Sequence, residues 1–168
     1  MFYYIGQGMG IAATVCCILI PLFQKKWQMS LCTGLANVFL ALNLVFIGQL
    51  GSAVIVNFLL VVQSGISIWH VTKEKPVSKV ENILFLVAFV GLGLIGFQSF
   101  LDLLPIAGAV FSMLSIFQPN EQRTRLLLFF NAICFFSYYV VVGSTSMFAE
   151  LFTIISSATG MIKYRKKH

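Results

Sequence analysis

The stretch ILFLVAFVGLGLIGFQSFLDLLPIAGAVFSMLSIF, residues 83–117, decides how many helices this chain forms. It is 35 residues long, whereas about 20 apolar residues cross a hydrocarbon core of about 30 Å as one helix. Gln98, Ser99 and Asp102 interrupt it, and Pro105 follows within one turn. We therefore predict two membrane-spanning helices here, at roughly 82–98 and 102–117. The alternative is a six-span chain in which one half of this stretch is re-entrant.

The composition of the whole chain is that of an integral membrane protein. Of its 168 residues, 59% are hydrophobic and 10% are charged, and the mean hydropathy is +0.95. Soluble domains carry about a quarter charged residues. Successive long apolar runs must form helices, because open strands leave backbone groups unpaired in lipid. No Lys or Arg precedes the first run, so we expect a true span there and no signal peptide.

Seven membrane-spanning helices fit the apolar runs. We expect them at roughly 3–23, 29–48, 51–70, 82–98, 102–117, 125–142 and 145–163. All 11 Lys and Arg residues fall in four clusters, at residues 25–26, 73–79, 123–125 and 163–167. With the N-terminus outside and the C-terminus inside, every cluster is cytoplasmic, as the positive-inside rule requires. This placement explains the formal charge of +6 without a nucleic-acid partner.

The chain repeats with a shift of 94 residues. The shift places Phe23-Gln24 on Phe117-Gln118 and Asn37 on Asn131, and after a small gap Gly48 matches Gly143. We predict two parallel three-helix repeats, residues 1–73 and 101–168, joined by a linker loop and helix within residues 74–100. Parallel repeats related by an axis along the membrane normal are a transporter architecture.

Polar residues inside the predicted spans are candidates for a binding site, because lipid cannot hydrate them. Asn37 and Asn131 occupy matching positions of the two halves, and the third span carries Asn57 and Ser64. Tyr138 shares a face with Asn131. The alternative role for such residues is helix packing. Three prolines are predicted to kink or end helices and to act as hinges in a transporter: Pro21, Pro105 and Pro119.

Glu150 is the least expected residue of the apolar runs, within SMFAELFTII at residues 146–155. A carboxylate at the centre of a span costs about 3 kcal/mol on insertion scales. Thr153 and Ser157 follow at helical spacing, and no basic residue lies on the predicted outer side. Two interpretations remain open. Glu150 is protonated or in contact with water and is bonded to Asn57 or to a tyrosine, or it lines a water-accessible pocket where it binds substrate or carries a proton.

Catalytic and metal-binding patterns are scarce. The four cysteines lie in apolar runs without a CxxC pair, which predicts neither disulfides nor a zinc site. The sequence contains no HExxH, GxSxG or P-loop motif. An enzyme within the membrane needs several ionisable groups close together, whereas the interior of the predicted spans offers one, Glu150. We expect no enzyme activity, no cofactor and no metal.

Three short motifs carry a family resemblance. Gly6-Gln7-Gly8-Met9-Gly10, Leu103-Leu104-Pro105-Ile106-Ala107-Gly108 and Gly143…Glu150 before a basic C-terminus resemble the YgjV-type bacterial inner-membrane proteins, over nearly the whole chain. That family resembles, more distantly, the PQ-loop group with the SWEET and SemiSWEET sugar facilitators and the PnuC vitamin transporters. The resemblance implies a multi-pass location in the bacterial inner membrane and the three-plus-one-plus-three design, N-out and C-in.

The PQ motif itself is degraded. Two residues separate Pro21 from Gln24, and the second half has Gln118-Pro119 in reversed order. The resemblance to SWEET proteins implies a pocket Asn on the third helix of each half. Asn57 matches it in the first half, whereas the second half offers Glu150 or Phe152, so a sugar substrate does not carry over.

These patterns together predict a small-molecule facilitator or proton-coupled carrier with alternating access between its two halves. The predicted substrate-binding residues are Asn37, Asn57, Ser64, Asn131, Tyr138, Glu150, Thr153 and Ser157. The expected partners are the lipid bilayer and a small polar metabolite, sugar-like or vitamin-like, in a monomer or homo-oligomer. The alternative is a non-transporting scaffold or receptor-like PQ-loop protein.

Overall fold

The computed structural model describes residues 2–19, 26–73, 78–116 and 121–164, and within these ranges it contains seven α-helices and no strand. The helices are α1 (Phe2–Leu19), α2 (Lys26–Phe46), α3 (Ser52–Lys73), α4 (Lys79–Ile95), α5 (Leu103–Ile116), α6 (Glu121–Val141) and α7 (Met147–Tyr164), with a short 3-10 turn η2 (Phe100–Asp102) before α5. The predicted all-α class and seven-helix count are confirmed.

The long apolar stretch is divided where its polar residues predict. The backbone N–H groups of Gln98 and Ser99 each donate to Oδ2 of Asp102 at 2.9 Å, and Ser52 Oγ donates to Oδ1 at 2.9 Å. The buried carboxylate thus holds the connection between α4 and α5 against the start of α3. Pro105 lies in the first turn of α5, where a missing N–H breaks no helical hydrogen bond.

Pro105 therefore lies at the start of a helix and does not interrupt one, and its hinge role stays a prediction. The other two predicted hinges, Pro21 and Pro119, lie outside the described residues.

Several helices begin before the apolar runs that predict them. α4 starts at Lys79, three residues early, because Ser78 forms a capping box with Glu81. Val80 N donates to Ser78 Oγ at 3.3 Å, and Ser78 N donates to Glu81 Oε2 at 2.8 Å. Hydropathy marks the apolar part of a helix, whereas the hydrogen-bonded helix continues through polar residues at its end.

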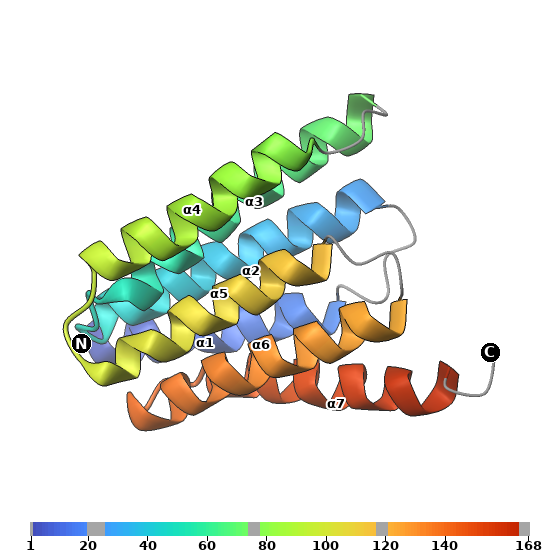
Figure 1. Cartoon of the computed structure of the whole chain (residues 1–168). Helices are drawn as coiled ribbons and strands as arrows, with labels where there is room; N and C mark the ends of the chain where they lie inside the picture. The colour runs from blue at the N-terminus through green and yellow to red at the C-terminus, as the bar shows by residue number, and fades with distance from the viewer. Residues whose placement is uncertain (1, 20–25, 74–77, 117–120, 165–168) are drawn as a thin grey trace.

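Six of the helices form a ring through their contacts with one another. α1 packs on α2, α2 on α3, α5 on α6 and α6 on α7, while α1–α7 and α3–α5 contacts close the ring between the two halves of the chain. α4 lies outside the ring and packs on α3 and α5. α1, α3, α5 and α7 run in one direction, so the predicted halves start at the same end of the bundle (Figure 1). This arrangement is compatible with the predicted repeat.

The turns after α2 and α6 have the same backbone geometry. Gly48 has φ +82° and Gly143 has φ +67°, values at which residues with a side chain are strained. In each turn the residue after the glycine donates to a carbonyl five residues back: Gln49 N to Leu44 O and Ser144 N to Tyr139 O, both at 2.9 Å. This is the Schellman pattern of a glycine-terminated helix. The two glycines are the pair that the sequence repeat aligns.

The bundle has two chemically different ends. We name the end with the N-terminus and the two glycine turns the N-terminal end, and the opposite end the basic end (Figure 1). The Lys and Arg side chains that the structure describes, Lys73, Arg123 and Arg125, lie at the basic end. The described basic side chains are thus gathered at one end of the bundle, and the orientation of that end in a membrane stays a prediction of the positive-inside rule.

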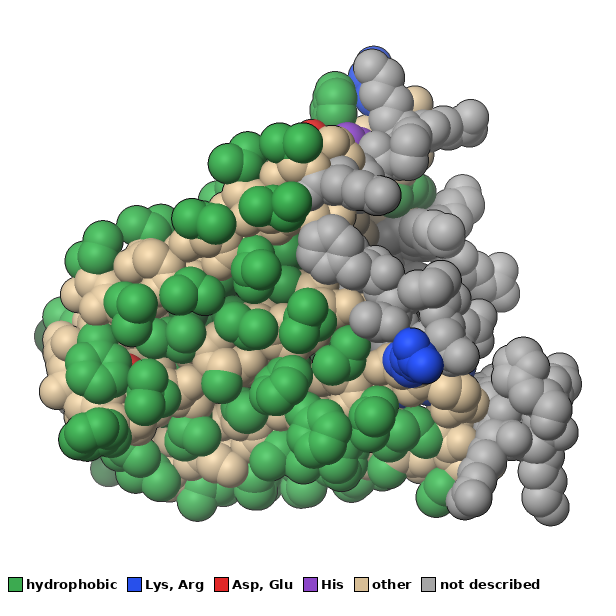
Figure 2. All heavy atoms as spheres, viewed as in Figure 1, with side chains coloured by type: hydrophobic (Ala, Val, Ile, Leu, Met, Phe, Trp, Pro, Cys, Tyr) green, Lys and Arg blue, Asp and Glu red, His purple; other side chains and the backbone are tan. Residues whose placement is uncertain are grey.

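The sides of the bundle are apolar. Figure 2 shows hydrophobic side chains over the face between the two ends, with the visible Lys and Arg side chains displaced toward the basic end. Large exposed side chains include Ile11 and Val15 of α1 and Ile83 and Val87 of α4. α1 and α3 are long and apolar enough to cross a membrane, and five further described helices carry shorter apolar segments. An exposed apolar surface of this extent marks a lipid-facing protein.

Candidate functional site

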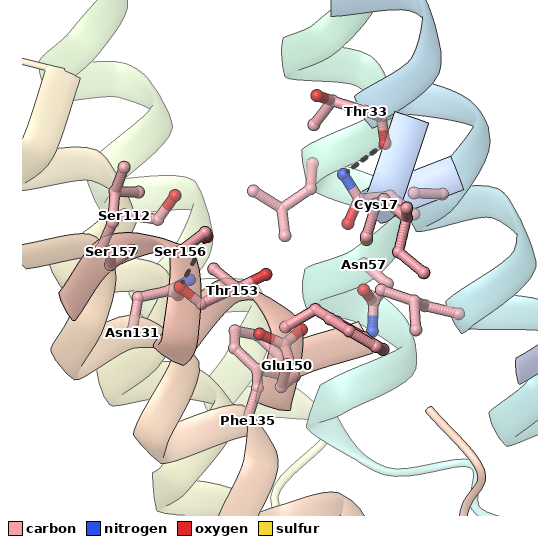
Figure 3. Close-up of a pocket in the computed structure, with 17 residues that line it drawn as sticks. Cys17, Thr33, Asn57, Ser112, Asn131, Phe135, Glu150, Thr153, Ser156 and Ser157 are labelled. Atoms are coloured by element: carbon pink, nitrogen blue, oxygen red, sulfur yellow. Dashed lines mark hydrogen bonds between the residues drawn. The ribbon is translucent and has the colours of Figure 1, made fainter. Parts of the chain in front are cut away.

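A cavity of about 530 Å³ lies at the centre of the six-helix ring. Every helix of the ring contributes to its wall, whereas α4 contributes none of the lining residues. Its polar lining consists of Cys17, Thr33, Asn37, Asn57, Ser112, Asn131, Glu150, Thr153, Ser156 and Ser157. Figure 3 shows the lining residues of α5, α6 and α7 facing those of α1, α2 and α3. The cavity therefore belongs to both halves of the chain.

Six of the eight predicted site residues line this cavity: Asn37, Asn57, Asn131, Glu150, Thr153 and Ser157. The structure places the other two elsewhere. Ser64 is buried, donates to Leu60 O of its own helix at 2.8 Å, and lies against Gly34 of α2. Tyr138 belongs to the apolar core. Both residues share helices with true lining residues, but neither reaches the cavity.

Glu150 lies in the first turn of α7, with 8% of its surface exposed. No side chain or backbone group in the described ranges donates a hydrogen bond to its carboxylate. The described part of the chain nevertheless contains no sealed side-chain oxygen or nitrogen without a partner. The Glu150 carboxylate is therefore in contact with the open cavity. The predicted bond between Glu150 and Asn57 or a tyrosine is not formed.

The amide nitrogen of Asn57 is used in hydrogen bonds at the part of the wall beside Glu150, which we call the cavity floor. Its Nδ2 donates to Ala53 O at 2.8 Å and to Tyr139 Oη at 3.2 Å, and Tyr139 has no exposed surface. This second bond joins α3 of the first half to α6 of the second half. The floor beside Glu150 is therefore fixed by a buried polar contact between the halves.

The asparagines of the sequence repeat, Asn37 and Asn131, line the same cavity from α2 and α6. Asn37 Nδ2 donates to Thr33 O of its own helix at 3.0 Å, which leaves the amide oxygen of this lining residue as an acceptor. The matching positions in the two halves thus supply the same chemical group to opposite walls.

Beyond Glu150, the N-terminal end of the cavity is closed by a polar cluster. We name the side chains of Gln7, Asn43, Ser144, Thr145 and Ser146 the end seal. Asn43 has no exposed surface; its Nδ2 donates to Gly6 O at 2.7 Å, and its Oδ1 accepts from Ser144 Oγ and Ser146 Oγ. These bonds connect α1 and α2 of the first half to the α6–α7 turn of the second.

Gln7 and Thr145 complete the end seal. Gln7 Nε2 donates to Gly143 O at 2.8 Å, while Thr145 N donates to Gln7 Oε1 and Thr145 Oγ1 to Gln7 O, both at 2.7 Å. Toward the basic end the lining is less enclosed: Thr33, Ser112 and Leu128 are half-buried, and Ser156 is exposed. The cavity is thus closed by hydrogen bonds at one end and more accessible toward the other.

Several residues that line the cavity were not among the predicted substrate-binding residues. Thr33 lies one helical turn before Asn37, so its spacing was an available signal, whereas Cys17 and Ser112 belong to α1 and α5, which carried no predicted substrate-binding residue. Ser156, beside Ser157, had no such signal. The apolar lining residues, such as Phe135 and Leu60, cannot be told from core residues by sequence because both are simply hydrophobic.

The polar groups of the wall are hydrogen-bonding groups. The described residues hold no group of three or more His, Cys, Asp or Glu side chains that would bind a metal ion. The cavity offers one carboxylate, amides, hydroxyls and apolar surface, which suits reversible hydrogen bonding to a small polar solute.

The chain matches the model of a family described as Imp-YgjV, bacterial inner membrane protein, over residues 4–168. Comparison with curated proteins and with solved structures finds no match. These comparisons give no support to the predicted likeness to PQ-loop, SWEET and PnuC proteins. Because the family match extends over almost the entire chain, the protein belongs to the Imp-YgjV family of bacterial inner membrane proteins.

Proposed function

We propose that this protein is a small-molecule transporter of the bacterial inner membrane, either a facilitator or a proton-coupled carrier. The observation that carries the proposal is the cavity shared by both halves of the chain, with a carboxylate near its closed end. A wall shared between two halves changes shape when the halves move relative to one another. That property is what alternating access requires.

We further propose seven membrane crossings with the N-terminus outside. The apolar sides of the bundle and the confinement of the described Lys and Arg side chains to one end support this topology. In this orientation the end seal faces outward, and the more accessible end of the cavity faces the cytoplasm. The structure then corresponds to an inward-facing state of the cycle.

The outward-facing state would require the end seal to open. Its bonds join polar groups that water can replace, so separating them costs less than exposing an apolar core of the same size. Pro21 and Pro119 stay predicted hinges. Glu150 would serve the cycle either by contacting the solute or by gaining and losing a proton as the cavity changes sides.

The direct test is uptake into proteoliposomes of a panel of labelled polar solutes, covering sugars and vitamin-sized compounds. We expect protein-dependent flux of at least one solute and its loss or strong reduction in Glu150→Gln. Glu81→Gln is the matched control, since Glu81 caps α4 outside the cavity and glutamine preserves a capping box. Flux unaffected by Glu150→Gln would remove Glu150 from the mechanism.

The same experiment separates transport from the alternative of a scaffold or receptor-like protein. Saturable binding of a solute by the purified protein, without flux in proteoliposomes that contain folded protein, would overturn the transporter proposal in favour of a receptor.

A further inference from the structure

We propose that the central cavity selects small organic cations, such as protonated amines that also carry hydroxyl groups. This inference rests on the proposed transport function for its physiological meaning, but it concerns the charge and chemistry of the cavity itself. It follows from three features of the wall. These are the charged residues in its lining, the lack of hydrogen-bond donors to Glu150, and the polar and aromatic groups of the other lining residues.

The lining of the cavity holds one acidic side chain and no basic one. Glu150 is the carboxylate that lines the cavity, and no lining residue is Lys, Arg or His. Of the described cationic side chains, Arg125 donates to Gly160 O at 2.7 Å, and Lys73 and Arg123 lie at the basic end; none belongs to the lining. An anionic solute would therefore enter the cavity without a countercharge and close to a carboxylate.

The Glu150 carboxylate is also unsatisfied. Its side chain is more than nine-tenths buried and is directed into the cavity, and the described residues supply it with no hydrogen-bond donor (Figure 3). A carboxylate buried without a partner is costly, whereas an ammonium group with N–H donors provides both countercharge and hydrogen bonds. A neutral polyol supplies donors but leaves the charge unpaired.

The rest of the wall suits the remainder of such a molecule. The carbonyl oxygens of Asn37 and Asn131 and the hydroxyl of Thr153 accept hydrogen bonds from solute hydroxyls. Phe135 and Phe152 add aromatic surface, and aromatic rings attract cations. A volume of about 530 Å³ falls within the range of small-molecule sites, roughly 300–1,000 Å³.

The first experiment reads the charge of the cavity without any solute. Cys17 lines the cavity, so a variant that keeps Cys17 and replaces Cys16, Cys32 and Cys134 by alanine carries one reporter thiol there. MTSET is a cationic thiol reagent and MTSES an anionic one. We expect the ratio of the MTSET rate to the MTSES rate at Cys17 to be about tenfold larger than the same ratio for a free thiol in solution. Glu150→Gln should return the ratio to that of the free thiol.

A variant that keeps only Cys134 is the matched control, because Cys134 is half-buried but does not line the cavity. Its ratio should not respond to Glu150→Gln. A Cys17 ratio equal to that of the free thiol would mean that Glu150 is neutral in the folded protein, and it would overturn the inference.

The second experiment uses three probes that share a six-carbon polyol skeleton: N-methylglucamine is a cation, sorbitol is neutral and gluconate is an anion. Occupancy of the cavity is read as protection of Cys17 from the neutral reagent N-ethylmaleimide. We expect protection to fall in the order N-methylglucamine, sorbitol, gluconate, with at least a tenfold difference in half-maximal concentration between the first and the last. Glu150→Gln should abolish this order.

The two proposals fail in distinguishable ways. Protection by N-methylglucamine without its uptake into proteoliposomes supports cation selectivity and contradicts transport. Uptake of sorbitol or gluconate in preference to N-methylglucamine supports transport and overturns cation selectivity. Absence of protection by all three probes, with Cys17 still reactive toward N-ethylmaleimide, also overturns cation selectivity.

Discussion

The turns after α2 and α6 share one backbone and make different contacts. Both end a helix with a left-handed glycine and the same pair of hydrogen bonds. The α6–α7 turn then places Ser144, Thr145 and Ser146 against α1 and α2 of the other half. The α2–α3 turn leads instead to Ser52, which binds Asp102 in the connection between α4 and α5.

This difference teaches that a repeated backbone can carry unequal functions. One turn closes the cavity by joining the two halves directly, and the other anchors the segment that links them. If the end seal opens during transport, the α6–α7 turn must release its partners, whereas the α2–α3 turn can keep its own. Four sets of substitutions test this comparison, from the largest expected effect to the smallest.

The largest effect is expected at Gly10, where α1 passes the α6–α7 turn. A Cβ atom there would clash with Thr145 Oγ1 and lie 2.9 Å from Ser146 N, which is backbone and cannot turn aside. We expect Gly10→Ala to lower the unfolding free energy by about 2–3 kcal/mol, as overpacking does. Titration of SDS into mixed micelles measures this quantity.

Gly8→Ala is the matched control, two residues away on the same helix, because a Cβ atom there meets nothing within 4 Å. Both substitutions gain the same helix propensity, so their difference reports the close approach alone. Equal stability of the two variants would show that α1 does not touch the turn.

The next effect is expected at Asn43. Asn43→Ala removes three hydrogen bonds, one from α2 to α1 and two from α2 to the α6–α7 turn, and at about 0.6 kcal/mol each we expect a loss of about 2 kcal/mol. Asn37→Ala, on the same helix, removes one bond within its own helix and should cost less than about 0.5 kcal/mol.

Asn43→Ala should also make Cys17 reactive toward MTSET added to the outer side of oriented vesicles, whereas Asn37→Ala should not. A protected Cys17 in Asn43→Ala would show that the end seal is not what closes the cavity.

The third effect on stability is expected at the α2–α3 turn. Ser52→Ala removes the side-chain donor to Asp102, a bond to a charged group, and should cost about 1.5 kcal/mol. Because this contact does not belong to the end seal, the reactivity of Cys17 from the outer side should stay unchanged. Ser137→Ala, which removes an exposed bond to Ile133 O of the same helix, is the control and should be close to neutral.

The smallest effect tests the likeness of the two backbones. Gly48→Ala and Gly143→Ala each force a side chain into the left-handed region and should each cost about 1 kcal/mol. A Cβ atom at either glycine would meet no other atom within 4 Å, so packing does not separate the two substitutions. A clearly larger loss for Gly143→Ala would mean that its turn depends on the end seal for its conformation.

Much of the fold was predictable from hydropathy and a few polar residues. The break in residues 83–117 was visible because Asp102 stands inside an apolar stretch, and its carboxylate does hold the connection there. Helix ends such as Lys79 were less predictable, because a capping box extends a helix beyond its apolar part. The ring order was not predictable, because hydropathy does not say which helices are neighbours.

The candidate site was predictable where a polar residue was costly in lipid. Asn37, Asn57, Asn131 and Glu150 all line the cavity because an apolar surrounding leaves polar groups few other places. Ser64 and Tyr138 show the limit of that reasoning. A serine can bond its own helix and a tyrosine can pack in the core, so neither requires a cavity. The apolar lining residues were not predictable, because nothing in the sequence distinguishes them from core residues.

The position of α4 outside the ring has a consequence for how such a chain can be built. Each half contributes three helices to the ring, an odd number, so two halves joined end to end would point in opposite directions. α4 adds one traverse of the bundle and lends the cavity wall no residue. Besides packing on α3 and α5, this helix connects the two predicted halves, and that connection is not needed when the halves are produced as two chains. Residues 1–73 and 101–168, produced together as separate chains, thus retain every group that the cavity needs.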